Sequence, residues 1–506
     1  MSILHAGSRL LRRARAPRPD GALAVKAGAT IHEHRLDNGL RLLLAERHSD
    51  PVVAVMTWYR VGARNEREDE AGVSHFLEHM MFKGSARFPK GAVDRITAQL
   101  GGVNNAFTSY DHTAYWFELA SDRWHRALEI EADRMQRLTL DPAEYAAERE
   151  VVLEELSMGL DDPWRNLADR VQAAVFARHP YRRPIIGHAD ALRQLPVEAM
   201  RDFYRRFYHP GNTTVVLCGD FEPADALAAV QRQMGSIPRG VDYAEADCFR
   251  ATLDVALGEQ RLSMRWDDQG RRLAMAWPTV AVGSDDDWAL DVVATLLASG
   301  RTSRLHRKLV VERGLATSVS AHNDSRVEGG VFWLFAECAQ GVAPERLEAA
   351  IDAELARLAL EKVQARELAR VRSMLAASEA QESETVSDLA EELGEFAVDA
   401  DWHLAVEAVE RLLAVRPEAI RDVTARLLVP ERRALGWCLP RADVARGAAP
   451  SRRQATRKAR LRRKVAAQPK AAAPGKRTPT RKRPAPSRRR VKRPAAKAAR
   501  RRSRKA

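Results

Sequence analysis

Cysteine is scarce in this sequence, and long apolar runs are absent from it. The 506 residues include four cysteines, at positions 218, 248, 338 and 438, and no two of them form a Cys-x-x-Cys pair. This spacing excludes a disulfide-dense scaffold, and we expect unpaired structural thiols. No window approaches the roughly 18 apolar residues of a membrane-spanning helix, so we expect no transmembrane segment.

The beginning of the chain lacks the apolar core of a secretory signal. Residues 1–19 are rich in Arg and contain no Asp or Glu, but they have no continuous apolar stretch. They suit either a transit-like peptide or a disordered leader, and we assign a leader to residues 1–29. We expect a cytoplasmic protein, and a periplasmic or organellar location stays open.

The end of the chain lacks acidic residues. Residues 452–506 hold 25 of the 82 Lys and Arg and no Asp or Glu, so the preceding 451 residues carry 57 basic against 68 acidic groups. The net charge of +14 therefore describes the tail and not the acidic body. From residue 446 onward Ala, Pro, Lys and Arg dominate, which predicts a disordered tail over 446–506. Such a tail either contacts nucleic-acid phosphates or an acidic surface without sequence specificity, or only solubilises and self-associates.

The acidic body is long enough for two domains. A chain of 506 residues exceeds the usual size of a single hydrophobic core, and its 45% hydrophobic and 30% charged residues are a globular balance. Residues 31–45 alternate around a turn at Asp37-Asn38-Gly39, and residues 52–59 are an apolar run, which together predict two neighbouring strands.

Helices and further strands follow these first strands. Residues 71–82 have helical spacing, and Gly101-Gly102 ends a second amphipathic helix. Residues 105–118 are rich in Thr, Tyr, Phe and Trp, which favour strands. Long helices are predicted for residues 122–138 and 142–159.

The order of elements repeats in the second half. Residues 115–138 read as a strand, a polar turn and a long helix, and residues 331–358 read the same way. Residues 273–280 match the apolar run at 52–59, and a helix at 288–299 takes the place of the 71–82 helix. This predicts a duplicated α+β unit, with a boundary near residues 236–258, where Gly, Pro and Asp cluster. We set the two domains at 30–238 and 239–445.

The 71–82 helix carries the pattern His-x-x-Glu-His. His75, Glu78 and His79 are at i, i+3 and i+4, so they share one face of the helix. Two neutral imidazoles can bind one Zn²⁺ ion, and a catalytic zinc site adds a third protein ligand and an open position for water. Glu78 beside such an ion is placed to act as general base and then to deliver the proton to a leaving amine.

The alternative is a helix surface with two solvated histidines and a glutamate. The flanking residues are apolar on the other sides of the helix, so the three polar groups belong to a largely buried element. These flanking residues are Phe76, Leu77, Met80, Met81 and Phe82. Because buried His and Glu need partners, this context favours a metal site.

Residues 75–84 resemble the motif helix of the pitrilysin, insulinase and mitochondrial processing peptidase family (M16) of inverted zinc metallopeptidases. The resemblance covers roughly residues 30–440. It implies an α+β fold of two duplicated α/β-sandwich domains of the LuxS/metallohydrolase-like type. It also implies metalloendopeptidase activity with one Zn²⁺ ion.

The same resemblance implies a third zinc ligand on a later helix. The family's glutamate-rich pattern reads Glu148-Arg149-Glu150-Val151-Val152-Leu153-Glu154-Glu155 here. Glu155, 76 residues after His79, matches the ligand, and Glu148 matches an acid behind the ligands. Glu148 and Glu155 are two helical turns apart and share a face, whereas the rival Glu154 points about 100° away. Taken alone, this stretch would suit a solvated acidic surface.

Residues 104–108 resemble the edge strand that pairs with the substrate backbone in the family. Asn105 and Ala106 are therefore candidate substrate-binding residues. The resemblance implies that extended peptides are hydrolysed inside an enclosed chamber.

One departure from the family concerns the second domain. Members that act alone carry an Arg and, seven residues later, a Tyr that steady the substrate carbonyl, but the corresponding residues here are Val310 and Thr317. The resemblance therefore implies a heterodimer, in which a related partner subunit without His-x-x-Glu-His supplies the Arg and Tyr. The alternative is a non-hydrolytic structural subunit of a larger assembly, against which the complete set of His75, Glu78, His79 and Glu155 argues.

Overall fold

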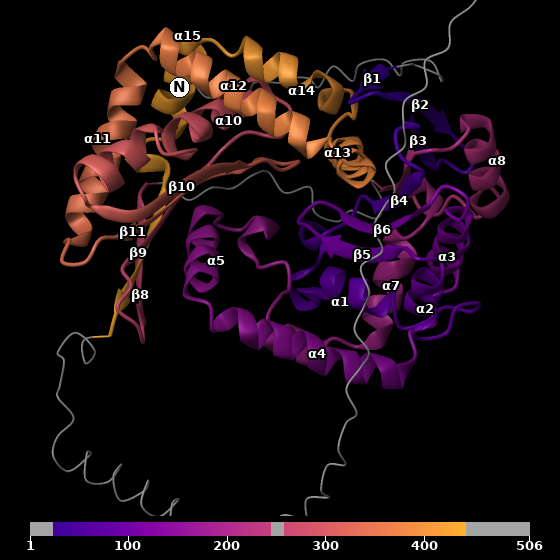
Figure 1. Cartoon of the computed structure of the whole chain (residues 1–506). Coiled ribbons are helices and arrows are strands. Elements are labelled where there is room, and N and C mark those ends of the chain that lie inside the picture. The colour runs from indigo at the N-terminus through magenta and orange to yellow at the C-terminus, as the bar shows by residue number, and fades with distance from the viewer. Residues whose placement is uncertain (1–23, 244–257, 442–506) are drawn as a thin grey trace, which may run out of the picture. The chain divides into compact units, whose positions relative to one another are not determined.

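The computed structural model describes residues 24–243 and 258–441, which form two β-sheets and their helices (Figure 1). The expected tail and Cys248 lie outside these residues, as does most of the expected domain boundary. Cys218, Cys338 and Cys438 are buried and unpaired, as expected. None of the helices within the two described ranges is long and apolar enough to cross a membrane.

The first sheet has seven strands in the order β1-β2-β3-β7-β4-β6-β5. The pair β3 and β7 is parallel, and the other neighbours are antiparallel. The strands are β1 (Ala24–Lys26), β2 (Ala29–Arg35), β3 (Arg41–Glu46), β4 (Val52–Tyr59), β5 (Val103–Thr108), β6 (Thr113–Ala120) and β7 (Thr213–Gly219).

Two predictions about this sheet were wrong. The hairpin of β2 and β3 and the strand β4 form where predicted, but β3 and β4 are not neighbours, because β7 lies between them. Short sequence separation could not reveal a strand that returns from more than 150 residues away. The leader was expected through residue 29, yet Ala24–Lys26 pair with β2. The Lys26 ammonium holds this strand by ion pairs with Glu379 and Glu392.

The helices of the first half agree with the predicted pattern. The motif helix is two residues shorter at each end than predicted, and the helix that Gly101 ends is α2. The helices are α1 (Val73–Met80), α2 (Ala92–Gln99), α3 (His125–Gln136), α4 (Pro142–Leu160), α5 (Pro163–Val175), α6 (Ala189–Gln194), α7 (Val197–Phe207) and α8 (Pro223–Met234).

The second sheet repeats five strands of the first. Its order, β10-β11-β9-β12-β8, corresponds to β5-β6-β4-β7-β3, and the parallel pair occupies the same place in both sheets. This confirms the predicted duplication. The strands are β8 (Gln260–Trp266), β9 (Arg272–Pro278), β10 (Ala316–Asp324), β11 (Val331–Cys338) and β12 (Ala434–Pro440). The helices are α10 (Asp285–Ala298), α11 (Pro344–Leu360), α12 (Ala365–Glu382), α13 (Val386–Asp399), α14 (His403–Ala414) and α15 (Pro417–Leu427).

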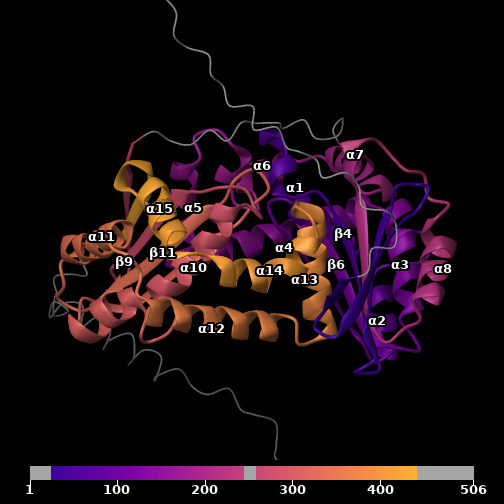
Figure 2. The same ribbon diagram turned by 90° about the horizontal axis from the view of Figure 1, so that it is seen from above.

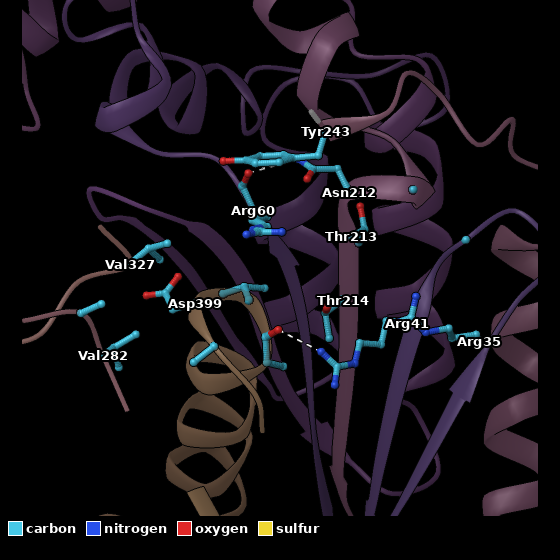
Figure 3. A pocket seen from close by; sticks show the side chains of 16 residues that line it. Arg35, Arg41, Arg60, Asn212, Thr213, Thr214, Tyr243, Val282, Val327 and Asp399 are labelled. Atoms are coloured by element: carbon cyan, nitrogen blue, oxygen red, sulfur yellow. Dashed lines mark hydrogen bonds between the residues drawn. The ribbon is translucent and has the colours of Figure 1, made fainter. Parts of the chain in front are cut away.

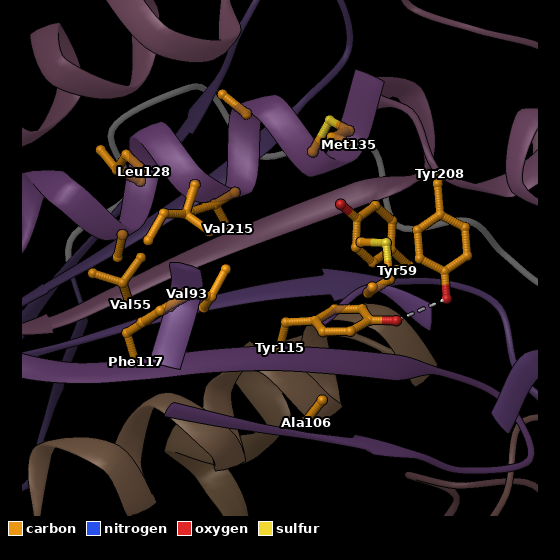
Figure 4. Close-up of a cluster of buried hydrophobic side chains, with 14 of the residues drawn as sticks. Val55, Tyr59, Val93, Ala106, Tyr115, Phe117, Leu128, Met135, Tyr208 and Val215 are labelled. Carbon is orange, nitrogen blue, oxygen red and sulfur yellow. Dashed lines mark hydrogen bonds between the residues drawn. The ribbon is translucent and has the colours of Figure 1, made fainter. Parts of the chain in front are cut away.

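Each sheet has one face covered by helices of its own half. In the first half, side chains of β4, β6 and β7 pack against α3, with Val55, Phe117, Val215, Leu128 and Met135 among them (Figure 4). In the second half, β9 and β11 pack against α10 and α11 in the same way. These two cores account for the apolar helix faces that the sequence pattern predicted.

The other face of each sheet is covered by a helix from the opposite half. Helix α13 of the second half packs on β4 and β7 of the first sheet, and α5 of the first half packs on β9 and β12 of the second sheet (Figure 2). The central strands of both sheets are therefore buried on two faces. This explains why β4 and β7 are almost continuously buried and contain no charged residue, since an alternating strand would place charged groups under a helix.

The contact between α13 and the first sheet depends on a glycine. A Cβ atom at Gly394 would lie 2.1 Å from Nε1 and 2.2 Å from Cε2 of Trp58, whose rigid indole is fully buried. The helix can approach β4 this closely only without a side chain at residue 394.

We predict that Gly394→Ala lowers the free energy of unfolding by about 1–3 kcal/mol, because overpacking forces α13 and the Trp58 indole apart. The measurement is chemical denaturation followed by circular dichroism. Glu391→Ala, at an exposed position of the same helix, is the control and should change stability by less than about 0.5 kcal/mol. Equal stability of Gly394→Ala and wild type would show that the close contact is not required.

Candidate metal centre

The motif helix α1 begins at a position that only glycine fills well. Gly72 has φ +100°, and a Cβ atom there would lie 2.5 Å from the carbonyl oxygen of Ile186. The fully buried carboxylate of Glu66 accepts hydrogen bonds from the backbone N–H of Gly72 (2.8 Å) and Ser74 (2.9 Å). Glu66 thus caps the helix from outside it and fixes where its first turn starts.

The burial of α1 divides its residues into two sets. The apolar side chains face the core, namely Val73, Phe76, Leu77 and Met80. His75, Glu78 and His79 are only partly buried and lie on the other side. The predicted combination of a buried helix and a polar face is therefore present.

The second helix of the site, α4, is anchored to α1 by an aromatic pair. Its first turn is capped by the Asp141 side chain, which accepts from the N–H groups of Ala143 and Glu144. Further along, the Tyr145 ring stacks on Phe76 of α1 with centroids 4.7 Å apart. Glu148 and Glu155 follow Tyr145 along the face of α4 that is turned toward α1.

The structure brings His75, His79 and Glu155 together. One ligand atom from each lies within 4.8 Å of the others. The Nε2 atom of His75 is 3.8 Å from Oε1 of Glu155, and Nε2 of His79 is 3.5 Å from Oε2. The rival Glu154 is exposed to solvent and does not belong to this group.

The chemistry of this group fits a zinc ion. Two imidazole nitrogens and one carboxylate are the donor set of many catalytic zinc sites, and the 44% exposed side chain of Glu155 leaves an approach for water. A histidine that binds a metal must do so through a neutral imidazole ring. Burial, with the neighbouring charges of His79 and Arg165, lowers the pKa of His75 to about 4, so this ring is neutral at pH 7.

Glu148 and Lys83 hold His79 on the side of its ring that faces away from Glu155. The Nδ1 atom of His79 is 2.9 Å from Oε1 of Glu148, and Lys83 Nζ is 2.6 Å from Oε2 of the same carboxylate. Burial opposes ionisation of Glu148, but its hydrogen bonds with Lys83 and His79 lower its pKa below the ordinary value. Glu148 therefore orients the His79 ring so that Nε2 points toward Glu155.

Glu78 lies beside the three candidate ligands and is held by a neighbouring strand. The Thr108 hydroxyl, at the end of β5, donates to Oε2 of Glu78 at 2.5 Å. Burial and the charge of Glu155 raise the pKa of Glu78, although the Thr108 hydrogen bond and the charge of His79 act in the opposite direction. A carboxylate with a raised pKa is a stronger base than an exposed one.

The candidate substrate-binding residues lie on β5, which forms one edge of the first sheet. Asn105 and Ala106 pair with Trp116 and Tyr115 of β6, and no other described strand pairs with β5. Asn105 is exposed and Ala106 is buried. The free edge of β5 is thus available to another extended chain.

The two positions that depart from the family lie in the second half. Val310 is in a π-helical turn, His306–Glu312, and packs against the second core. Thr317 lies at a bulge near the start of β10, where its hydroxyl is 3.4 Å from the carbonyl oxygen of Glu337. Neither side chain offers a cation or a phenol to a substrate.

Three residues of the site were not singled out by the sequence. Thr108 stands in the edge-strand stretch, but nothing in the pattern assigned it to Glu78. Glu66 and Lys83 lie just outside the motif helix, and their roles depend on contacts that helical periodicity does not encode. A polar residue at the end of the strand beside the motif was the only signal that could have indicated Thr108.

A second cluster has a similar composition but a different character. His112, Glu395 and Asp399 also have ligand atoms within 4.8 Å of one another. However, His112 Nδ1 is 3.0 Å from both carboxylate oxygens of Asp399. Burial opposes protonation, but the charge of Asp399 and this hydrogen bond raise the pKa of His112 to about 9. The ring is therefore cationic at pH 7, and it forms an ion pair with Asp399 instead of acting as a metal ligand.

Asp399 also lines a separate cavity of about 470 Å³ (Figure 3). Arg35, Arg41 and Arg60 contribute to its walls, and the guanidinium of Arg41 donates to the carbonyl oxygen of Ala397 at 2.9 Å. None of the candidate zinc ligands lines this cavity. It is thus distinct from the metal centre.

Comparison with known proteins agrees with this geometry. The sequence profile of "Insulinase (Peptidase family M16)" matches residues 41–189, and that of "Peptidase M16 inactive domain" matches residues 194–375. An uncharacterized zinc protease of Mycobacterium tuberculosis is 32% identical over 314 residues, which are 62% of this chain and 70% of the relative. Zinc protease PqqE of Helicobacter pylori is 27% identical over 397 residues, covering 75% of this chain and 88% of the relative.

Solved structures show the same fold. The crystal structure of a protease from Helicobacter pylori has a TM-score of 0.76 at 25% identity, covering 81% of this chain and 100% of that chain. A peptidase M16 inactive domain from Pseudomonas fluorescens has a TM-score of 0.73 at 18% identity, covering 81% of this chain and 98% of that chain.

We predict that Glu155→Gln weakens zinc binding by at least about 100-fold, because it removes a charged ligand and not merely a supporting contact. Competition with a chromophoric chelator measures the affinity. Glu154→Gln, one residue earlier on the same helix, is the matched control and should stay within about twofold of wild type. Loss of zinc from the Glu154 variant, with retention by the Glu155 variant, would reverse the assignment.

Proposed function

The chain belongs to the insulinase family, peptidase family M16, and from this membership we propose that it is a zinc-dependent endopeptidase acting on extended peptides. The observation that carries the proposal is the convergence of His75, His79 and Glu155, with Glu78 beside them on the same helix face. In this proposal His75, His79 and Glu155 hold one Zn²⁺ ion.

The residues of the site have different roles in peptide hydrolysis. When bound, zinc activates a water molecule and polarises the carbonyl group of the scissile bond. Glu78 accepts a proton from the attacking water and later delivers it to the nitrogen of the leaving amine as the C–N bond breaks. Thr108 keeps the Glu78 carboxylate in place through its 2.5 Å hydrogen bond. Glu148, itself held by Lys83, maintains the orientation of His79.

The edge of β5 supports the choice of an extended substrate. A peptide that adds to this edge would be bound by backbone hydrogen bonds at Asn105 and Ala106, next to the residue that orients Glu78. A hollow of about 420 Å³ between α5 and β10 adds a place for a substrate side chain, since it is lined by Trp164, Arg165, Ala168, Ser318, Ser320 and Phe335. The charge of Arg165 influences the pKa of His75, so this hollow is within electrostatic reach of the metal centre.

The second half supports the proposal of a partner subunit. Val310 packs against the second core and Thr317 lies at a strand bulge, so this half supplies no Arg and Tyr at these positions. We propose that a related subunit without His-x-x-Glu-His supplies them and that the two subunits enclose the substrate.

A non-hydrolytic structural subunit is the second candidate function. The match of residues 194–375 to a domain described as inactive favours it. The arrangement of Glu78 speaks against it, because a structural subunit has no need for a hydrogen-bonded carboxylate beside an intact ligand group.

We predict that Glu78→Gln abolishes peptide hydrolysis, with a fall in kcat of at least about 100-fold, because the amide cannot accept the proton from water. Its zinc content, measured by elemental analysis, should equal that of wild type, since Glu78 is not a ligand. Hydrolysis of a quenched fluorescent peptide provides the rate. A fully active Glu78→Gln enzyme would remove this residue from the mechanism.

We further predict that the chain alone hydrolyses peptides poorly and that a motif-less sibling carrying the Arg and Tyr restores the rate. Co-expression and purification of the two chains, followed by the same peptide assay, measures this. The matched control is a sibling in which that Arg is replaced by Ala, which should assemble without restoring activity. Full activity of the lone chain would contradict the need for a partner.

A further inference from the structure

The turn between β10 and β11 inserts a buried arginine into the first half of the chain. Arg326 is only 3% exposed. Its guanidinium carbon lies 3.9 Å from the ring centroid of Tyr110 and 5.0 Å from that of Tyr181, and Nη2 donates to Oε1 of Gln172 at 3.0 Å. Asp324, at the end of β10, forms the ion pair that balances its charge.

Several backbone contacts fix the same turn. The carboxylate of Asp111 accepts from the N–H of Val327 at 3.2 Å, and the Tyr181 hydroxyl accepts from the N–H of Glu328 at 3.2 Å. Asp111 also accepts from Arg64 Nε and from the Tyr181 hydroxyl, both at 2.7 Å. Asp111 is therefore the point at which both halves of the chain meet in one buried hydrogen-bond network.

One of the two tyrosines that receive Arg326, Tyr110, belongs to the hairpin that holds Glu78. Tyr110 and Asp111 form the turn between β5 and β6, two and three residues after Thr108. The carbonyl oxygen of Tyr110 accepts from the N–H of Arg64 at 2.8 Å, so the turn is held on its other side as well. A shift of this turn would displace Thr108 and with it the Glu78 carboxylate.

The contacts of Arg326 suit a residue that positions its neighbours better than one that only holds the two halves of the chain together. Its Nη1 atom is buried without a hydrogen-bond partner among the described residues, and the flat guanidinium instead covers aromatic faces. Such stacking fixes the orientation of the Tyr110 ring, which a simple ion pair would not do. A lysine ammonium cannot stack in this way.

We propose that Arg326 is a positioning residue for the reaction and acts on Glu78 through Tyr110 and Thr108. The proposal rests on the proposed peptidase function. It gives the second half, which carries no metal ligand in the described centre, an indirect part in positioning the general base.

The test compares Arg326→Ala and Arg326→Lys with Arg433→Ala. Arg433 is the matched control, because it is also 3% exposed and ion-paired, with Glu259 at 2.8 Å and Glu348 at 3.4 Å, but its partners lie in the second half. Hydrogen–deuterium exchange of residues 103–113 reports on the hairpin without requiring activity. Peptide hydrolysis and zinc content are measured on the same samples, at a temperature where circular dichroism shows each variant folded.

In Arg326→Ala we expect exchange in residues 103–113 to accelerate about tenfold and kcat to fall about 10- to 100-fold, with KM within about twofold and zinc content unchanged. Arg326→Lys should recover part of both effects. Arg433→Ala should lower stability but leave the hairpin exchange and kcat near the wild-type values. Should the alanine variant not fold, Arg326→Gln, which keeps a hydrogen-bond donor and removes the charge, takes its place.

Unchanged hairpin exchange in Arg326→Ala would overturn the proposal, and so would an equal effect of Arg433→Ala. If wild type bound no zinc or lacked turnover with every partner, the peptidase function would fail. The exchange comparison would still decide whether Arg326 orders the hairpin.

Discussion

The packing of each sheet against a helix from the other half is the constraint on which the rest of the structure depends. Helix α13 covers the second face of the first sheet, and α5 covers that of the second. Neither half could expose these apolar strand faces to water without a large loss of buried surface. Because α4 leads directly into α5, this exchange also holds the far end of the helix that carries Glu155. The second half thus supports the metal centre without providing a ligand to it.

Two clusters of histidine and carboxylate side chains differ in the protonation state of the histidine, because the groups around each histidine differ. His75 lies beside the imidazole of His79, and burial keeps it neutral. His112 is more deeply buried, but it contacts the carboxylate of Asp399 directly, and it is therefore protonated. The first cluster can donate nitrogen lone pairs to a cation. In the second cluster the positive charge of His112 is already balanced by the Asp399 carboxylate. Ligand type alone does not distinguish the two sites.

The parts of the site that were predicted from sequence are those set by local periodicity. His75, Glu78 and His79 share a face because a helix repeats every 3.6 residues, and Glu148 and Glu155 do so for the same reason. The duplication was visible because strands and helices recur in the same order. In contrast, the insertion of β7 between β3 and β4, the exchange of α5 and α13, and the contact of Thr108 with Glu78 depend on long-range packing. No spacing in the chain encodes these contacts. The pairing of residues 24–26 with β2 was likewise not visible in the sequence, because Lys26 is held by two acids that are distant in the chain, Glu379 and Glu392.

The proposed peptidase function depends on the coordination of one zinc ion by two imidazoles and a carboxylate. X-ray absorption at the zinc edge of the purified full chain measures this directly. The expected spectrum shows nitrogen and oxygen neighbours only, at about 2.0–2.2 Å, with the multiple-scattering pattern of two imidazole rings. A sulfur shell near about 2.3 Å, or a shell of oxygen atoms without imidazole scattering, would contradict a centre built from His75, His79 and Glu155.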